Sequence, residues 1–593
     1  MRHEISRRIL KTVLVMLVSS LLFLAGWFSP DVWADDWPLA AALEIEQRLQ
    51  PPVMTAFAMS SDQGTDLCGA LARFYRYRNY APAWVDRYGL LPEAALALAV
   101  LKQADNQGLR YVDYYNPWVD DILGGMITRP VILGASFDGK QAALDLALSD
   151  MVLRYVYDRA LGRIDPHTIA DRRGAASPPP SRDLARELAE MLDRGRLASF
   201  FDTLGPQQTA YQALRNSLPR YRKIAAAGGW TTIAEGPKLQ RGDCGPRVAQ
   251  LRERLAVSGD ARPSSECMVP CFDDGLAEAV ARFQHRHGLH PDGVVGDQTL
   301  AALNVPVETR IHQIQLNLER WRWMPEALGP RYVLANIPGF QLQMVDNGQV
   351  VKTLRTIVGK QDRPTPVLTS MITYLEINPY WHVPPTIAGQ DLLPKIQADP
   401  SFLIRQHFRV FDGWGADAHE ISPYAVDWSA LSERYFPYRL RQEPAAGNAL
   451  GRVKIMFPND DSVYIHDTPA RSLFKRTARS FSSGCVRVEE PLTLAGLLLS
   501  RQGWDKDRLD QAVAAHDRQI VTLDEPVPVY LVYWTAWADP NGDINFRDDI
   551  YGRDQTLLEA MTARPALHTT CRNIGPHPTY LGDYRTEEHG GSF

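Results

Sequence analysis

The chain has 593 residues, of which 45% are hydrophobic and 22% are charged, and this length suggests three or four domains with ordinary globular cores. Lys plus Arg number 64 and Asp plus Glu number 69, a formal net charge of −5. This balance argues against a polybasic nucleic-acid binder and against a disordered acidic chain. Six cysteines are too few for a disulfide scaffold.

Residues 1–34 have the layout of a secretory signal peptide. A basic stretch that ends at Lys11 precedes an uncharged apolar run over residues 12–28, and Val32 and Ala34 are small residues at the −3 and −1 positions of a cleavage site. A retained inner-membrane anchor is the alternative, because the run is at the short end for a membrane span. Both interpretations place the bulk of the chain outside the cytoplasm.

Residues 35–235 are predicted to be mostly helical. Pro92 and Gly108 suit the start and the end of a helix, and apolar residues recur at helical spacing over residues 144–162. We expect Trp84 and the other aromatic residues of this region to lie in its core. No catalytic pattern of His, Cys and carboxylates gathers here, so the region is interpreted as a helical N-terminal scaffold domain.

Residues 236–306 form a distinct unit of short helices punctuated by glycines at turns that need positive φ. The unit contains Leu239-Gln240-Arg241-Gly242-Asp243-Cys244-Gly245, then Gly288-Leu289, and then Asp292-Gly293-Val294-Val295-Gly296. It resembles the small three-helix peptidoglycan-binding module. The resemblance implies weak, reversible attachment to cell-wall glycan or stem peptide.

Three histidines in this unit, His285, His287 and His290, invite a metal site. We expect none, because residues two apart on a helix do not share a face and no cysteine or carboxylate completes a ligand set.

From residue 331 the hydrophobic period changes from that of helices to that of strands. Alternating apolar residues flank Asn347-Gly348, a pair typical of a tight β-hairpin turn. Residues 331–540 are therefore predicted to form a β-rich domain, with an aromatic insertion at about 386–446 that folds as a lid or small subdomain. Residues 551–593 are predicted to be a mobile C-terminal tail.

Two segments of the β-rich domain carry chemistry. In a strand, Val463 and Ile465 point to one face while Tyr464 and His466 point to the other. The second segment is Ser482-Ser483-Gly484-Cys485-Val486-Arg487, in which a glycine allows a sharp bend just before a cysteine. An imidazole close to the thiol would give a thiolate–imidazolium pair, and the thiolate would attack a carbonyl to form a thioester. A buried structural cysteine and a strand histidine are the alternative on residue types alone.

The span 331–500 resembles the YkuD-type catalytic domain of the L,D-transpeptidases, cysteine enzymes that remodel peptidoglycan cross-links. Their signature is a strand histidine followed by S/T-x-G-C-I/V-R, here His466 and residues 482–487. Three further segments are similar to the large Gram-negative branch: residues 359–366, Asn378-Pro379-Tyr380-Trp381 and His466-Asp467-Thr468-Pro469. The predicted order of helical domain, peptidoglycan-binding module and catalytic domain with a lid-like insertion is also the order in that branch.

The resemblance implies that Cys485 is the nucleophile and that His466 is the general base and then the general acid. Backbone N–H groups at Gly484 and Cys485 would stabilise the oxyanion. Tyr464 and Arg487 are weaker assignments, and Arg487 either meets a substrate carboxylate or forms a structural salt bridge. Ser483 stands where many members have His, which makes it a candidate partner for the imidazole or the substrate. The group that orients the imidazole is left open.

The expected function is a periplasmic L,D-transpeptidase. It would form 3→3 cross-links between a tetrapeptide donor stem and the side-chain amine of a diamino-acid acceptor stem, with release of D-alanine. Neither metal nor nucleotide is expected, and the partner is peptidoglycan, with other cell-wall synthesis enzymes as further candidates. The alternatives are an L,D-carboxypeptidase, an enzyme that attaches protein to peptidoglycan and, from another class, a non-catalytic wall-binding scaffold. Five cysteines besides Cys485 leave an odd number whose pairing is open: Cys68, Cys244, Cys267, Cys271 and Cys571.

Overall fold

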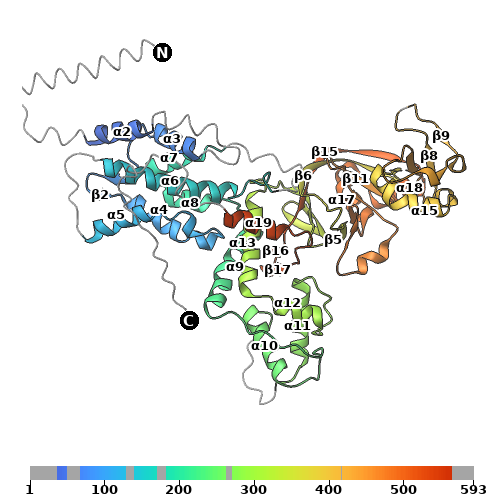
Figure 1. The fold of residues 1–593 in the computed structure, drawn as a ribbon, viewed down its shortest axis with the longest axis horizontal. Helices are drawn as coiled ribbons and strands as arrows, with labels where there is room; N and C mark the ends of the chain where they lie inside the picture. The colour runs from blue at the N-terminus through green and yellow to red at the C-terminus, as the bar shows by residue number, and fades with distance from the viewer. Residues whose placement is uncertain are drawn as a thin grey trace, which may run out of the picture.

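The computed structural model describes residues 37–49, 67–128, 139–169, 182–261, 270–415 and 417–563. The predicted signal peptide, Cys267 and Cys571 lie outside these residues. Within the described ranges, no helix has both the length and the apolar character that a membrane crossing needs. Figure 1 shows three lobes: N-terminal helices at one end, a β-rich domain at the other, and a small helical module beside their junction.

The N-terminal lobe is helical, as predicted. Its longest helix, α6, is buried along most of its length, and Trp84 is fully buried against it through a hydrogen bond from Nε1 to Ser149 Oγ of 2.7 Å. Cys68 in this lobe is disulfide-bonded. The helices are α2 (Trp37–Arg48), α3 (Leu67–Tyr77), α4 (Pro92–Lys102), α5 (Pro117–Thr128), α6 (Gly139–Leu161), α7 (Leu184–Asp193), α8 (Leu197–Thr203) and α9 (Thr209–Ala226), with a short hairpin of β1 (Val85–Asp86) and β2 (Gly89–Leu90).

The small module has the three predicted helices, α10 (Pro246–Ser258), α11 (Asp274–Arg286) and α12 (Asp297–Leu303). Asp273 caps α11 by accepting from the Leu276 N–H, and an apolar core joins the three helices. A disulfide joins Cys244 to Cys271, which settles one pairing that the sequence left open.

The β-rich domain is built on a nine-stranded sheet in the order β13-β5-β14-β12-β11-β6-β15-β3-β4. Strand β4 also pairs with β5, so eight strands close into a ring with β13 on the outside of β5. The turn between β4 and β5 has positive φ at Asn347 and Gly348, as predicted. The strands are β3 (Arg331–Asn336), β4 (Gln341–Asp346), β5 (Gln349–Gly359), β6 (Leu368–Ile377), β11 (Val453–Met456), β12 (Ile465–His466), β13 (Ser480–Ser482), β14 (Val486–Val488) and β15 (Gln519–Val532). Helices α17 (Pro491–Leu499) and α18 (Lys506–Ala514) contribute to the same core.

The insertion is a subdomain with its own sheet and its own apolar core. Its sheet has the order β7-β10-β8-β9 and begins at Trp381, a few residues before the predicted boundary. The elements are β7 (Trp381–His382), α14 (Pro385–Ile387), η4 (Ala388–Leu392), α15 (Leu393–Ala398), α16 (Ser401–Arg405), β8 (Phe408–Phe411), β9 (Glu420–Ile421) and β10 (Arg439–Gln442). In Figure 1 it lies at the end of the molecule farthest from the N-terminal helices.

A separate core joins α9 of the N-terminal lobe to the β-rich domain. Helix α13 (Val307–Arg322) packs against α9, β16 (Ala536–Ala538) and β17 (Ile544–Phe546). The prediction of a mobile tail from residue 551 is wrong at its start, because α19 (Arg553–Ala563) is a helix that buries Leu557 and Met561 beside α13. These two apolar side chains on one helical face are the signal that the sequence analysis overlooked.

Candidate active site

The predicted nucleophile and histidine lie on one face of the sheet. Strands β12 and β14 are parallel neighbours that pair Ile465 with Val486 and His466 with Arg487. Because side chains alternate along a strand, Ile465 and Val486 point into the core, where both are fully buried, and Tyr464, His466, Cys485 and Arg487 share the other face. We call these last four residues the nucleophile face. The register brings together four of the six predicted site residues.

The Cys485 thiol is nearest in register to Tyr464 rather than to His466. The Val486 N–H donates to the Tyr464 carbonyl at 3.1 Å, and the Tyr464 side chain acts to lower the pKa of the thiol. The rings of Tyr464 and His466 meet edge to face, with centroids 5.5 Å apart. Tyr464 therefore lies between the other two side chains and contacts both.

A charged row continues this face across the sheet. His466 pairs with Lys454 on β11, and Lys454 pairs with Glu376 on β6. Lys454 Nζ lies 4.3 Å from the centre of the Tyr464 ring and 3.7 Å from a Glu376 carboxylate oxygen. Neither Lys454 nor Glu376 was predicted from the sequence, although Lys454 lies among apolar residues there.

The turn before the nucleophile is held by its own serine. Gly484 has φ +112°, a conformation that favours glycine. Ser482 Oγ donates to the Cys485 carbonyl at 2.5 Å and accepts from the Gly484 N–H at 3.2 Å. The Gly484 N–H is thus engaged within the turn, which leaves the Cys485 N–H as the better of the two predicted oxyanion donors.

A loop over residues 360–366 supports this turn from outside. The fully buried Thr365 donates from Oγ1 to the Gly484 carbonyl at 2.7 Å and accepts from the Gly359 N–H at 2.9 Å. The Lys360 N–H donates to the Ser482 carbonyl at 3.0 Å. These bonds fix both ends of the nucleophile turn to the end of β5.

Arg363 in the same loop connects the nucleophile turn to the insertion. Its guanidinium donates to Ser483 Oγ at 3.0 Å and to the Asp391 carboxylate at 2.6 Å, and it also bonds Gln390. Asp391 belongs to η4, at the start of the insertion. Ser483, predicted as a partner for the imidazole or the substrate, instead accepts from Arg363.

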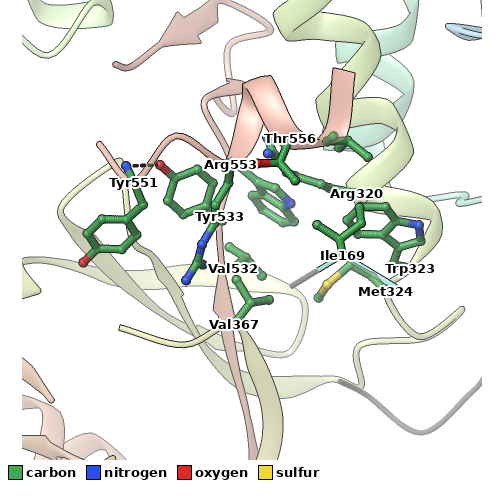
Figure 2. Close-up of a pocket in the computed structure, with 12 residues that line it drawn as sticks. Ile169, Arg320, Trp323, Met324, Val367, Val532, Tyr533, Tyr551, Arg553 and Thr556 are labelled. Atoms are coloured by element: carbon green, nitrogen blue, oxygen red, sulfur yellow. Dashed lines mark hydrogen bonds between the residues drawn. The ribbon is translucent and has the colours of Figure 1, made fainter. Parts of the chain in front are cut away.

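A cavity of about 200 Å³ lies behind this support, between Ile169 of the N-terminal lobe, α13 and α19. Figure 2 shows Tyr551 and Tyr533 on one of its walls, joined by a hydrogen bond from the Tyr551 N–H. The Tyr551 hydroxyl donates to the Gly359 carbonyl at 2.6 Å, and Arg553 donates to the Thr365 carbonyl at 3.2 Å. The cavity does not contain Cys485, and its wall residues act on the site through the supporting loop.

Burial dominates the electrostatics of the nucleophile face. Burial, together with the charges of Arg487 and Lys454, lowers the pKa of His466 to about 3. Burial also raises the pKa of the Cys485 thiol, against the opposing influence of Tyr464, Lys454 and Arg487. These directions favour a neutral thiol and a neutral imidazole at rest, in contrast to the thiolate–imidazolium pair expected from the sequence.

The sequence left open the partner of Arg487 and the group that orients the His466 ring. Arg487 has no carboxylate within 4.0 Å among the residues that the structure describes, so the structural salt bridge is absent there. His466 Nδ1 is buried and has no hydrogen-bond partner in the described part of the chain, and the Asp467 backbone only partly offsets the lowering of its pKa. Asp467 itself accepts from the Arg452 N–H and the Thr468 N–H and so fixes the backbone that follows the imidazole.

Comparisons with protein-family models recognise three parts of the chain. Residues 330–522 match the L,D-transpeptidase catalytic domain, residues 69–218 match a scaffold domain, and residues 244–303 match a peptidoglycan-binding domain. The chain therefore carries these three domains in the predicted order, and the predicted multidomain α and β fold class is confirmed.

A protein of Haemophilus influenzae named as an L,D-transpeptidase is 38% identical over 251 residues, which cover 42% of this chain and 50% of the relative. The match thus spans about half the length of that relative. Among solved structures, an L,D-transpeptidase from Xylanimonas cellulosilytica is 18% identical, covers 50% of this chain and all of its own, and has a TM-score of 0.17. One from Stackebrandtia nassauensis is 14% identical over 51% of this chain and 96% of its own, with a TM-score of 0.19.

Proposed function

We propose that this chain, which carries an L,D-transpeptidase catalytic domain and a peptidoglycan-binding domain, is a periplasmic transpeptidase that forms 3→3 cross-links through a thioester on Cys485. The observation that carries the proposal is the shared face of Cys485, His466, Tyr464 and Arg487 on two paired strands of that domain. Periplasmic action rests on the signal peptide predicted over residues 1–34.

The reaction starts from a neutral Cys485 thiol and a neutral His466 imidazole. The Cys485 sulfur attacks the carbonyl at the L-centre of the diamino-acid–D-alanine bond in a tetrapeptide stem, while His466 accepts the thiol proton. The Cys485 N–H stabilises the oxyanion, and the imidazolium then protonates the departing D-alanine amine. A side-chain amine of a second stem attacks the thioester and gives a proton to His466, and the imidazolium passes that proton to the departing Cys485 sulfur, which restores the thiol.

Two cations on the nucleophile face suit this substrate. Arg487 and Lys454 both act electrostatically on the Cys485 sulfur. Their charges stabilise negative charge that develops on sulfur and oxygen during attack, and Arg487, with no salt bridge among the described residues, is available for a substrate carboxylate. This arrangement supports an anionic peptide donor.

The insertion accounts for the preference of amine over water in this scheme. Because Arg363 ties Asp391 of the insertion to Ser483 beside the nucleophile, the insertion covers the acyl-enzyme and limits the access of water. Poor exclusion of water would make the same site an L,D-carboxypeptidase. An acceptor amine carried by an envelope protein would make it a protein-attachment enzyme.

The test is an incubation of the full chain with disaccharide-tetrapeptide, followed by mass spectrometry of the products. We expect a cross-linked dimer, free D-alanine and a thioester on the peptide that contains Cys485. The Cys485→Ala variant should form none of these, and retained cross-linking by it would contradict the assignment. A tripeptide as the sole product would identify a carboxypeptidase, and an unreactive Cys485 would identify a non-catalytic scaffold.

A further inference from the structure

A groove of about 360 Å³ separates the peptidoglycan-binding module from the catalytic domain. The module contributes Gln298 and Ala301 of α12, the catalytic domain contributes Phe340 and Ala478, and Arg310 of α13 and Arg547 after β17 complete the walls. We call this the interdomain groove. It does not include Cys485 or any other residue of the nucleophile face.

Two arginines give the interdomain groove an excess of positive charge. Arg310 is only 7% exposed, donates to Gln313 Oε1 at 2.7 Å and to the Ala302 carbonyl at 3.3 Å, and keeps a buried Nε without a hydrogen-bond partner among the described residues. Arg547 donates to the carbonyls of Arg286 and Phe546 at 2.9 and 2.7 Å. In the described ranges, no carboxylate lies within 4.0 Å of either guanidinium.

The surroundings supply only part of the missing negative charge. Arg479, next to Ala478, is a further arginine whose charge acts on Arg547. Arg286 is already paired with Asp260 at 2.5 Å. Asp548 on the exposed rim of the groove acts electrostatically on both Arg310 and Arg547, but it lies beyond salt-bridge distance of either and is one carboxylate against two guanidinium groups. Since buried charges are costly unless they are paired, the remaining positive charge suits an anionic ligand that enters the groove.

The groove lies within reach of the nucleophile along the chain. Ala478 leads directly into β13 and then to Cys485, seven residues later, a span of at most about 25 Å for an extended backbone. An extended tetrapeptide measures only about 14 Å. Cys485 does not line the groove, so a ligand there does not present the carbonyl that reacts, and one wall polymer can occupy both places.

We propose that the interdomain groove binds a carboxylate-bearing stem peptide of peptidoglycan other than the stem that reacts with Cys485. Arg310 and Arg547 bind its carboxylates, and the apolar walls of the groove contact its apolar parts. The choice of ligand rests on the proposed function, because the groove alone specifies only an acidic peptide. Through this contact the module holds a neighbouring stem of the strand while another stem occupies the nucleophile face.

The test uses the full chain carrying Cys485→Ala. It measures how far a ligand slows hydrogen exchange of the backbone amides of residues 297–303 and 545–550. The probes are disaccharide-tripeptide with free carboxylates, the same compound with its carboxylates amidated, and inorganic phosphate. We expect protection of both segments by the acidic compound, with at least tenfold weaker binding of the amidated one. Equal binding of both compounds, or phosphate binding as tightly as the acidic compound, would overturn the proposal.

Two variants locate the ligand. Ala301 is exposed on the groove wall, so Ala301→Trp fills the groove without changing a buried position, and we expect it to weaken binding at least tenfold. Ala514→Trp, at an exposed position on α18, is the matched control and should bind normally. Unchanged binding by Ala301→Trp would exclude the groove as the site.

A second readout separates this proposal from the proposed function. With Cys485 intact, Ala301→Trp should process soluble disaccharide-tetrapeptide normally and lose at least fivefold of its activity on polymeric peptidoglycan. If the ligand protects the groove from hydrogen exchange but the chain with intact Cys485 forms no thioester, the groove remains a binding site and only the proposed function is overturned. If Ala301→Trp loses the same activity on the soluble and the polymeric substrate, the groove proposal is overturned.

Discussion

The nucleophile face and the interdomain groove place their residues in opposite ways. The face draws Tyr464, His466, Cys485 and Arg487 from two short segments on neighbouring parallel strands, and one register fixes all four. The groove collects side chains from residue 287 to residue 550, and its shape depends on how the module docks against α13 and the catalytic domain. Strand alternation alone determines the first site, whereas the second exists only in the assembled chain.

The two sites also differ in how their charges act. On the nucleophile face, neighbouring groups shift the pKa values of a few buried side chains, and Lys454 and Arg487 both act on the Cys485 sulfur. In the groove, Arg310 and Arg547 have no salt bridge in the described part of the chain, and Asp548 acts on them only from a distance. A change on the face should therefore alter reaction rates while wall binding persists, and a change in the groove should do the reverse.

The largest effect should come from His466→Ala. Removal of the group that accepts the thiol proton should lower the rate of thioester formation by about 10²–10⁴-fold, with groove protection by disaccharide-tripeptide unchanged. The measurement is single-turnover mass spectrometry of the acyl-enzyme, with His419→Ala, whose side chain is 85% exposed, as the control. A loss below about threefold would show that His466 is not the group that accepts the thiol proton.

The next largest effect should come from Thr365→Val, which keeps the shape of a buried side chain and removes its hydroxyl. The Gly359 N–H and the Gly484 carbonyl both lose a partner, and an unsatisfied buried group costs about 1–3 kcal/mol. We expect a lower unfolding midpoint of the catalytic domain and about a tenfold slower thioester formation, as the nucleophile turn loosens. Thr522→Val at an exposed strand position should change neither quantity.

The sequence predicted the nucleophile face because its signals are local. The alternation at Val463 to His466 and the Ser-Ser-Gly-Cys-Val-Arg segment each identify side-chain directions without reference to the rest of the chain. The hairpin turn at Asn347-Gly348 and the helices of the small module were predictable for the same reason, since turn chemistry and periodicity act over a few residues.

The supporting residues could not be predicted in this way. Thr365 and Arg363 reach the nucleophile turn across 119 and 120 residues of sequence. Tyr551 supports it indirectly by a bond to Gly359, which is 192 residues away from Tyr551 in the sequence. Their contacts depend on the closure of the sheet and on the return of the chain after β15, which no local pattern encodes. The resting thiol was missed because its cause is burial, and burial of Cys485 follows from the assembled domain.

The third prediction concerns Arg363→Met, which keeps an unbranched side chain and removes its bonds to Ser483 and Asp391. Without this connection, the insertion should admit more water to the thioester, so the ratio of tripeptide to cross-linked dimer should rise about fivefold. Donor consumption should change less than threefold, which distinguishes this effect from damage to the nucleophile face. Arg405→Met, which removes an exposed ion pair within the insertion, is the matched control. An unchanged product ratio would mean that water exclusion does not depend on this connection.

The smallest predicted effect tests whether the face rests as a neutral pair. Because the pKa of the Cys485 thiol is raised and the pKa of His466 is lowered to about 3, the thiolate fraction should fall about tenfold for each pH unit below the thiol pKa. Alkylation of Cys485 by iodoacetamide, followed by mass spectrometry of its peptide, should therefore rise continuously from pH 6 to pH 8 without a plateau. Tyr464→Phe removes a hydroxyl whose influence lowers the pKa of the thiol, so it should raise the thiol pKa further and slow alkylation at pH 8 about threefold. Tyr424→Phe, at an exposed tyrosine, should leave the profile unchanged. A plateau that extends down to about pH 5 would instead indicate a thiolate–imidazolium pair, and the proton would then have left the sulfur before the substrate arrives rather than during its attack.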